Sequence, residues 1–404
     1  MTILSAARQR YTLLLAFACF VAQGIMSGML GVAWPSIRAT FGLPLDALVA
    51  LLIASTIGYV LGSFLASLLL ARIGVGWALL LTNLVGASGF FGFVLAPSWA
   101  VLAAFGLLTG WGAGTTGTVL NIYVASTRTV RTMNWMHASF GVGASIGPLL
   151  MTAIVAAGVT WRLGYAIGAF IHLGLGLLFL TAVRTMTFRG VNHATVEDPL
   201  ARPAPISATL RLPMVWLSIV LFLLYTGVES TAGQWTYTWF TESRAASAYL
   251  AGAMTSVFWV MLTVGRVVFG AGAARIGVAR LLRLSMLGTV LAATLLLVRS
   301  LPIGFVAIAL MGLSLSAIFP TLTADAPRRV GARHAGNAIG LQTGAASIGM
   351  AVLPGLAGAI AARVGLEALG PYLVFAALLM LLVNQVAMMT MQRQEARLET
   401  ATGD

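Results

Sequence analysis

The sequence predicts an all-α membrane protein with twelve transmembrane helices in two parallel six-helix repeats. The first observation is composition: 59% of the 404 residues are hydrophobic and 8% are charged, whereas soluble domains average about 45–50% and about 25%. The others are twelve apolar segments and one repeated motif. A soluble fold is therefore excluded. The net charge of +13 comes from 23 basic residues, all of them arginine, and 10 acidic residues. These arginines are spread between apolar runs, which indicates membrane topology and not nucleic-acid binding.

The twelve segments each approach the roughly 20 apolar residues that cross a bilayer. The first exceeds the apolar core of a secretory signal, about 7–15 residues, and is therefore predicted to be a span. In chain order the predicted spans are 11–37, 45–70, 77–95, 99–126, 133–157, 161–183, 213–239, 247–270, 281–298, 303–324, 335–361 and 366–388.

The positions of the arginines predict which side of the membrane is cytoplasmic. Seventeen arginines fall on the side of the N-terminus, and Arg266 lies within a span near that side. The opposite side collects only five arginines, namely Arg38, Arg162, Arg244, Arg299 and Arg363. Because arginine is enriched in cytoplasmic loops, both termini are predicted to be cytoplasmic, in a bacterial inner membrane.

A polar, proline-bearing stretch divides the chain into halves. We predict an N-terminal bundle over 1–183, a cytoplasmic linker over 184–212 and a C-terminal bundle over 213–404. The motif Ala-Arg-Ile-Gly-Val at 71–75 returns at 274–278, nearly half the chain later. Both copies end the second span of their half, as expected for parallel repeats.

The loop after the second span resembles that of the major facilitator superfamily. The superfamily pattern is Gly, an acid four residues later, then Arg-x-Gly. This chain keeps Arg72 and Gly74 but has Ser67 at the first position and Ala71 in place of the acid. This resemblance implies a transporter in which two six-helix bundles alternate access.

A narrower resemblance is to the fucose permease-like sugar:proton symporters. Residues 134–148 resemble their N-x-x-H-x-x-F-G-x-G-A-x-x-G-P stretch, and residues 318–321 their I-F-P-T. Glu229 with Gly233 and Trp235 resembles E-x-x-x-G-x-W. This implies a sugar or sugar-like solute and proton coupling. Where that branch carries acids in its first and fourth spans, this chain has Gln23 and Asn121.

Glu229 is the main candidate for chemistry, because it is the acid well inside a predicted span. Ionisable side chains in the bilayer are costly and default to functional hypotheses. Its position, about 16 residues after Pro213, places it about 24 Å along the helix, in the outer half. We predict that it binds solute, couples protons, or does both. A neutral glutamic acid that bridges two helices is the structural alternative.

Polar and aromatic side chains near mid-depth complete the predicted solute site. Tyr and Trp offer an apolar face with one hydrogen-bond donor, which suits both sugar rings and aromatic drugs. The predicted solute-binding residues are Gln23, Trp111, Ser145, Tyr225, Glu229 and Trp259.

A second site is predicted at the cytoplasmic gate. Asp325 is expected to pair with Arg266 or Arg275. Gly143 and Gly147, and the glycines 110, 112 and 114, are predicted to bring helices close together. The four histidines lack metal-ligand spacing, so no metal or cofactor is expected. Nucleotide-binding loops and nucleophile motifs are also missing from the sequence, which argues against an enzyme.

These features predict a secondary active transporter that acts as a monomer and moves a small polar organic solute, a sugar or sugar-like compound, across the bilayer by alternating access with proton coupling. The alternative is a drug or lipophile exporter of the same fold, since 17 methionines would suit an adaptable apolar cavity.

Overall fold

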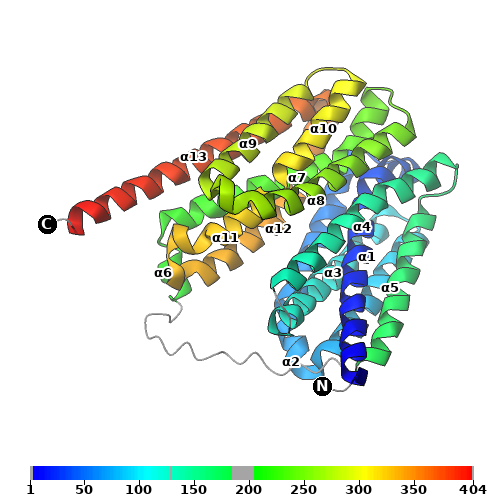
Figure 1. Ribbon diagram of the computed structural model, residues 1–404. Helices are drawn as coiled ribbons and strands as arrows, with labels where there is room; N and C mark the ends of the chain where they lie inside the picture. The colour runs from blue at the N-terminus through cyan, green and yellow to red at the C-terminus, as the bar shows by residue number, and fades with distance from the viewer. Residues whose placement is uncertain (1–2, 128–129, 184–203, 403–404) are drawn as a thin grey trace. The chain divides into compact units, whose positions relative to one another are not determined.

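The computed structural model describes residues 3–127, 130–183 and 204–402, and within them all regular structure is helical (Figure 1). Two compact units form, and each is described by itself. The first comprises the described residues of Met1–Ala194 with Gly233–Val260 and Ala361–Arg363. The second comprises those of Thr195–Ala232, Met261–Ile360 and Val364–Asp404.

The first unit is built on five long helices. They are α1 (Ile3–Phe41), α2 (Leu48–Leu95), α3 (Trp99–Thr127), α4 (Val130–Ala156) and α5 (Arg162–Ala182). α1 packs along α4, and α2 packs along α3 and α5. Residues from all five helices form one apolar core, with Leu79, Val124 and Phe179 fully buried in it.

The remaining helices follow the linker. They are α6 (Ile206–Thr209), α7 (Pro213–Ser243), α8 (Ala248–Ile276), α9 (Val278–Leu295), α10 (Leu301–Leu315), α11 (Ile318–Val330), α12 (Ala332–Val364) and α13 (Leu369–Thr402). In the second unit α9 packs against α10 and α13, and a buried cluster joins α7 to α12 and α13. The end of α7 and the start of α8 belong to the first unit.

Each predicted span lies largely in helix. Ten stretches of the described chain are long and apolar enough to cross a membrane. One of them, Leu45–Leu95 with 51 residues, covers the second and third predicted spans. α3 covers the fourth span, and α10 with α11 covers the tenth within Leu301–Val330. The predicted all-α membrane fold is confirmed. Most of the predicted linker lies outside the described residues, and the boundaries of the two bundles stay a prediction.

Two glycines turn the chain at equivalent places of the repeat. α2 is kinked at Gly74, where φ is 76°, so the predicted loop between its two spans is a bend inside one helical stretch. Gly277, at the same position of the second motif copy, separates α8 from α9 and has a φ of 82°. Only glycine adopts positive φ without steric cost, which explains why the repeated motif keeps glycine here.

Glycine also sets the contact between α1 and α4. A Cβ built on Gly143 would overlap the backbone oxygen of Val21, and one on Gly147 would overlap that of Ile25. Both distances fall well under the 3.0 Å that real Cβ atoms keep from other heavy atoms. The prediction that glycines four residues apart bring helices together is confirmed for this pair.

We expect Gly143→Ala to destabilise the protein by about 1–3 kcal/mol, because the added methyl must push two helix backbones apart. Gly117→Ala is the matched control, since a Cβ at Gly117 meets no atom within 4 Å. Thermal unfolding in detergent should show a lower midpoint for Gly143→Ala alone. Equal midpoints for the two variants would contradict the close packing of α1 on α4.

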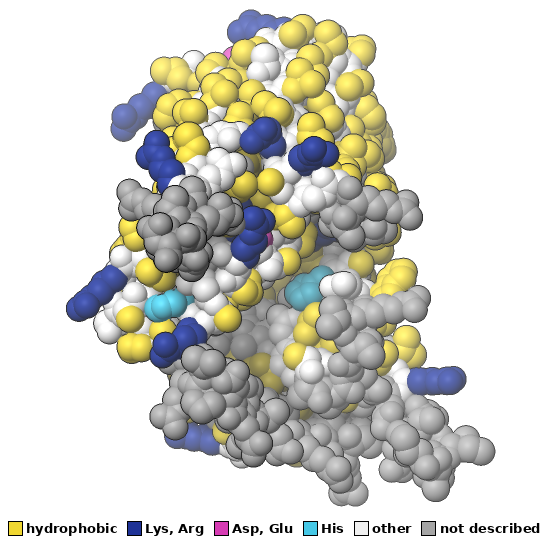
Figure 2. Space-filling model, turned by 60° about the vertical axis from the view of Figure 1, so that its left-hand side comes forward, with side chains coloured by type: hydrophobic (Ala, Val, Ile, Leu, Met, Phe, Trp, Pro, Cys, Tyr) yellow, Lys and Arg dark blue, Asp and Glu magenta, His cyan; other side chains and the backbone are white. Residues whose placement is uncertain are grey.

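The outer surface is largely apolar, as a bilayer-spanning protein requires. In the face shown in Figure 2, hydrophobic side chains cover wide areas and arginines stand apart. Large side chains such as Phe64, 77% exposed, and Phe375, 67% exposed, point outward. In a multi-pass membrane protein these side chains contact lipid instead of water.

Candidate functional site

An acid, a phenol and a guanidinium meet on α7 and α8 of the second unit. Tyr225 and Glu229 stand four residues apart on α7, so they share one helix face. The Tyr225 hydroxyl donates a hydrogen bond to Glu229 Oε2. Arg266 on α8 places Nη2 3.8 Å from the same oxygen and also interacts with Tyr225. We call these three residues the Glu229 cluster.

The members of the Glu229 cluster differ in exposure. Tyr225 is fully buried, at 1% exposed, whereas the side chains of Glu229 and Arg266 remain 17% and 31% exposed. The phenol is therefore a fixed anchor, and the ion pair is the part that another molecule can reach. Two opposite charges with accessible surface can bind hydroxyl groups by charge-assisted hydrogen bonds.

Aromatic and backbone contacts hold this part of α7 in place. Phe319 at the start of α11 lies with its ring centroid 5.1 Å from that of Phe222 and 6.0 Å from that of Tyr225. Thr226 Oγ1 donates to the backbone oxygen of Ala346 on α12 at 2.8 Å. Phe319 belongs to the I-F-P-T stretch, so that motif supplies an aromatic wall beside Tyr225.

Glu229 has a neighbour that the sequence analysis did not assign to it. It lies near the middle of α7, which runs from Pro213 to Ser243. Arg266 on α8, which ends at Ile276, reaches it from the adjacent helix. The expected depths of the two residues in the membrane stay predictions.

The other predicted solute-binding residues lie in the first unit. Gln23 and Trp111 are partly buried on α1 and α3. The backbone oxygen of Ser145 on α4 accepts a hydrogen bond from Ser256 on α8 at 2.5 Å. Trp259, also on α8, packs its indole ring on Gly233 of α7. Within the predicted set, Tyr225 and Glu229 are in direct contact.

The predicted gate pair takes another form. Asp325 Oδ2 accepts a hydrogen bond from Arg329 Nε at 2.7 Å, one turn along α11. Arg266 is not its partner, since Arg266 lies against Glu229 instead. The side chain of Arg275 falls outside the described residues. The Asp325–Arg329 pair is also deeply buried, with side chains 5% and 1% exposed.

A different ion pair joins the ends of α1 and α7. Arg38 Nη2 lies 2.8 and 2.7 Å from the two carboxylate oxygens of Glu242. Nearby, a Cβ on Gly31 would meet the backbone oxygen of Gln234 at 2.7 Å, so the two helices approach closely. This pair was not predicted, because its members lie in different halves of the sequence.

In the described part of the chain, no group of three His, Cys, Asp or Glu side chains lies close enough together to hold a metal ion. His172 is buried and bonds through Nδ1 to the backbone oxygen of Gly168 at 2.9 Å. His137 packs against Phe20 edge to face, with ring centroids 5.3 Å apart. These contacts give both histidines a structural explanation.

Comparison with known sequences finds relatives over most of the chain. The family profile described as Major Facilitator Superfamily matches residues 16–343 and 217–403. Bypass of stop codon protein 6 of Saccharomyces cerevisiae is 25% identical over 276 residues, 62% of this chain and 54% of that protein. Glucose/mannose transporter GlcP of Bacillus subtilis is 23% identical over 265 residues, 65% of this chain and 66% of that protein. The chain thus matches between about half and two thirds of the length of these curated relatives.

Solved structures share the fold. The nucleoside transporter NupG has a TM-score of 0.72 at 13% identity, and the match covers 95% of this chain and 98% of the other. A bacterial homolog of the human lysosomal transporter Spinster, inward-facing and occupied, has a TM-score of 0.74 at 15% identity. That match covers 95% of this chain and 97% of the other. At such identities the similarity concerns the fold alone.

Proposed function

Because this chain belongs to the major facilitator superfamily and is a transporter rather than an enzyme, we propose that it moves a small hydroxylated solute, a sugar or sugar-like compound, together with protons. The observation that carries the proposal is the Glu229 cluster near the middle of a membrane-spanning helix. Ionisable side chains at this depth mark solute or ion pathways. The transporter is proposed to work as a monomer.

The chemistry of the Glu229 cluster suits hydroxyl groups. A carboxylate accepts hydrogen bonds, a guanidinium donates several, and together they can bind the adjacent hydroxyls of a sugar ring. Phe319 is partly buried and lies with its ring centroid 6.0 Å from that of the buried Tyr225, so its ring is the candidate for the apolar contact that sugar ring faces need. The similarity to a glucose/mannose transporter supports the same solute class.

Competition at one oxygen supports proton coupling. The Arg266 guanidinium pairs with Oε2 of Glu229, and the Tyr225 hydroxyl donates a hydrogen bond to the same oxygen. Protonation of the carboxylate would remove its attraction for Arg266 and free the guanidinium for the solute. We propose that Glu229 thereby links proton and solute movement, and that solute release restores the ion pair.

Reconstituted vesicles test the solute class. Labelled glucose, mannose, a nucleoside and a cationic dye are offered with an inward proton gradient. Saturable uptake of a hexose or nucleoside, competed by unlabelled solute, is the expected result. Extrusion of the dye without sugar or nucleoside uptake would instead establish the exporter alternative.

We further propose that the Arg38–Glu242 pair closes the outer side. Because the two side chains are 22% and 30% exposed, the ion pair stabilises the closed arrangement by only about 0–1 kcal/mol. Glu242→Gln should thus raise thiol labelling at Gln234→Cys by up to about fivefold, in a Cys19→Ser background. Glu367→Gln, which breaks the Arg299–Glu367 pair, is the control. Unchanged labelling after Glu242→Gln would show that this ion pair does not close the outer side.

The proposed location is the bacterial inner membrane with both termini in the cytoplasm, on the strength of the arginine bias. A reporter fused after Asp404, or inserted at Ala201 in the linker outside the described residues, should be cytoplasmic. A periplasmic signal from either reporter would reverse the orientation.

A further inference from the structure

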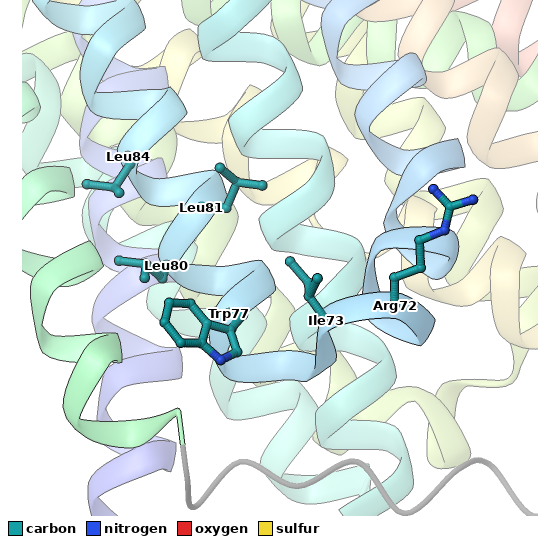
Figure 3. Close-up of a pocket in the computed structure, with 6 residues that line it drawn as sticks. All are labelled: Arg72, Ile73, Trp77, Leu80, Leu81 and Leu84. Atoms are coloured by element: carbon teal, nitrogen blue, oxygen red, sulfur yellow. The ribbon is translucent and has the colours of Figure 1, made fainter.

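The kink in α2 creates a groove on the surface of the first unit. Figure 3 shows it in the angle between the two parts of α2, with Arg72 and Ile73 before the bend and the other lining residues after it. The groove has a volume of about 600 Å³. It is lined by Arg72, Ile73, Trp77, Leu80, Leu81 and Leu84.

The lining combines one cation with apolar surface. Arg72 is exposed, and the six lining residues include no acid. Trp77 is 50% exposed, and Ile73 and Leu81 are 39% exposed. Large apolar side chains open to the outside in a membrane-spanning chain face acyl chains. Tryptophan is enriched where the headgroup region meets the hydrocarbon.

We propose that this groove binds an anionic phospholipid. Arg72 binds the phosphate by paired N–H donors, a geometry that arginine favours. Trp77 lies beside the glycerol region, and one acyl chain follows Leu81 and Leu84. Leu84 stands two helical turns after Trp77, which is about 10 Å along the helix and into the hydrocarbon.

The positive charge of Arg72 favours an anionic headgroup over a zwitterionic one. A zwitterionic headgroup carries an ammonium or choline cation that no acid in the lining can pair and that Arg72 repels. Anionic headgroups lack this second charge and add attraction to a surface arginine, an effect worth about fivefold in partition per arginine near the membrane. Gly74 permits the bend that shapes the groove, because its φ of 76° disfavours other residues although a Cβ there would meet nothing within 4 Å.

Fluorescence quenching by brominated lipids tests the proposal. The full-length protein is placed in nanodiscs of phosphatidylcholine with rising fractions of brominated phosphatidylglycerol or, separately, brominated phosphatidylcholine. The signal from Trp77 is the difference between the parent and Trp77→Phe. We expect half-maximal quenching of Trp77 at a lower fraction of brominated phosphatidylglycerol than of brominated phosphatidylcholine.

Variants at Arg72 assign the selectivity. Arg72→Gln should raise the phosphatidylglycerol fraction for half-maximal quenching by about fivefold, and Arg72→Lys should restore most of the preference. Arg280→Gln, which changes an exposed arginine on α9, is the matched control and should change nothing. Equal quenching by both brominated lipids in the parent, or an unchanged preference in folded, monodisperse Arg72→Gln, would overturn the proposal.

Discussion

Asp325→Asn is expected to destabilise the protein by about 3–5 kcal/mol, the cost of leaving a buried charge without its partner. Arg329 has a side chain only 1% exposed, and its Nε donates to Asp325 at 2.7 Å. Both Nη atoms lack a hydrogen-bond partner in the described part of the chain. Asparagine keeps the shape and one acceptor but removes the negative charge, so the guanidinium loses its main compensation.

Thermal unfolding in detergent measures this effect. Asp325→Asn should lower the midpoint strongly, and the double variant Asp325→Leu/Arg329→Met should recover most of the loss, because removal of both charges leaves nothing to compensate. Glu367→Gln serves as the control, since its partner Arg299 is 75% exposed and such pairs contribute about 0–1 kcal/mol. A single variant as stable as the parent, or a double variant no better than the single, would refute this assignment.

Glu229→Gln is expected to abolish solute accumulation driven by a pH gradient while solute exchange continues. Glutamine still accepts the hydrogen bond from Tyr225, and it retains polar contact with a solute. It cannot titrate, and it cannot alternate between Arg266 and a proton. The variant should therefore only equalise the solute concentration across the membrane.

Tyr225→Phe is the companion variant for this prediction. It removes the hydroxyl that donates to Glu229 and leaves the carboxyl group in place. Solute affinity should fall while accumulation by a pH gradient persists. If Glu229→Gln accumulates solute as the parent does, coupling resides elsewhere. If it loses exchange as well, Glu229 acts chiefly as a solute ligand.

The helices could be predicted because bilayer thickness fixes their length and composition. The apolar runs were visible in the sequence, and the repeated motif marked the glycines that turn the chain at Gly74 and Gly277. The bend inside α2 was less predictable, since a sequence window cannot distinguish a tight loop from a glycine kink that keeps helical structure on both sides.

The partners of the charged residues were harder to predict. Counting residues placed Glu229 and Arg266 at different depths, and no local pattern in the sequence indicated that the two side chains would meet. Arg329 follows Asp325 by four residues, so helical spacing could have indicated that pair before the more distant Arg266. Burial, which makes the pair important, depends on tertiary packing.

The solute site was predicted in part. Tyr225 and Glu229 share a helix face, which follows from spacing alone. Phe319 lay within the I-F-P-T resemblance, but nothing in the sequence placed its ring against Tyr225. The Arg38–Glu242 pair joins the two halves of the sequence, and only the folded chain reveals such contacts.

Solute-induced proton movement tests most directly whether Glu229 couples solute to protons. Vesicles containing the parent protein, with a trapped pH dye and no imposed gradient, receive an outside pulse of the transported hexose or nucleoside. We expect acidification of the lumen with the parent and none with Glu229→Gln, although both admit labelled solute. Solute entry through the parent without any pH change would contradict the coupling role of Glu229.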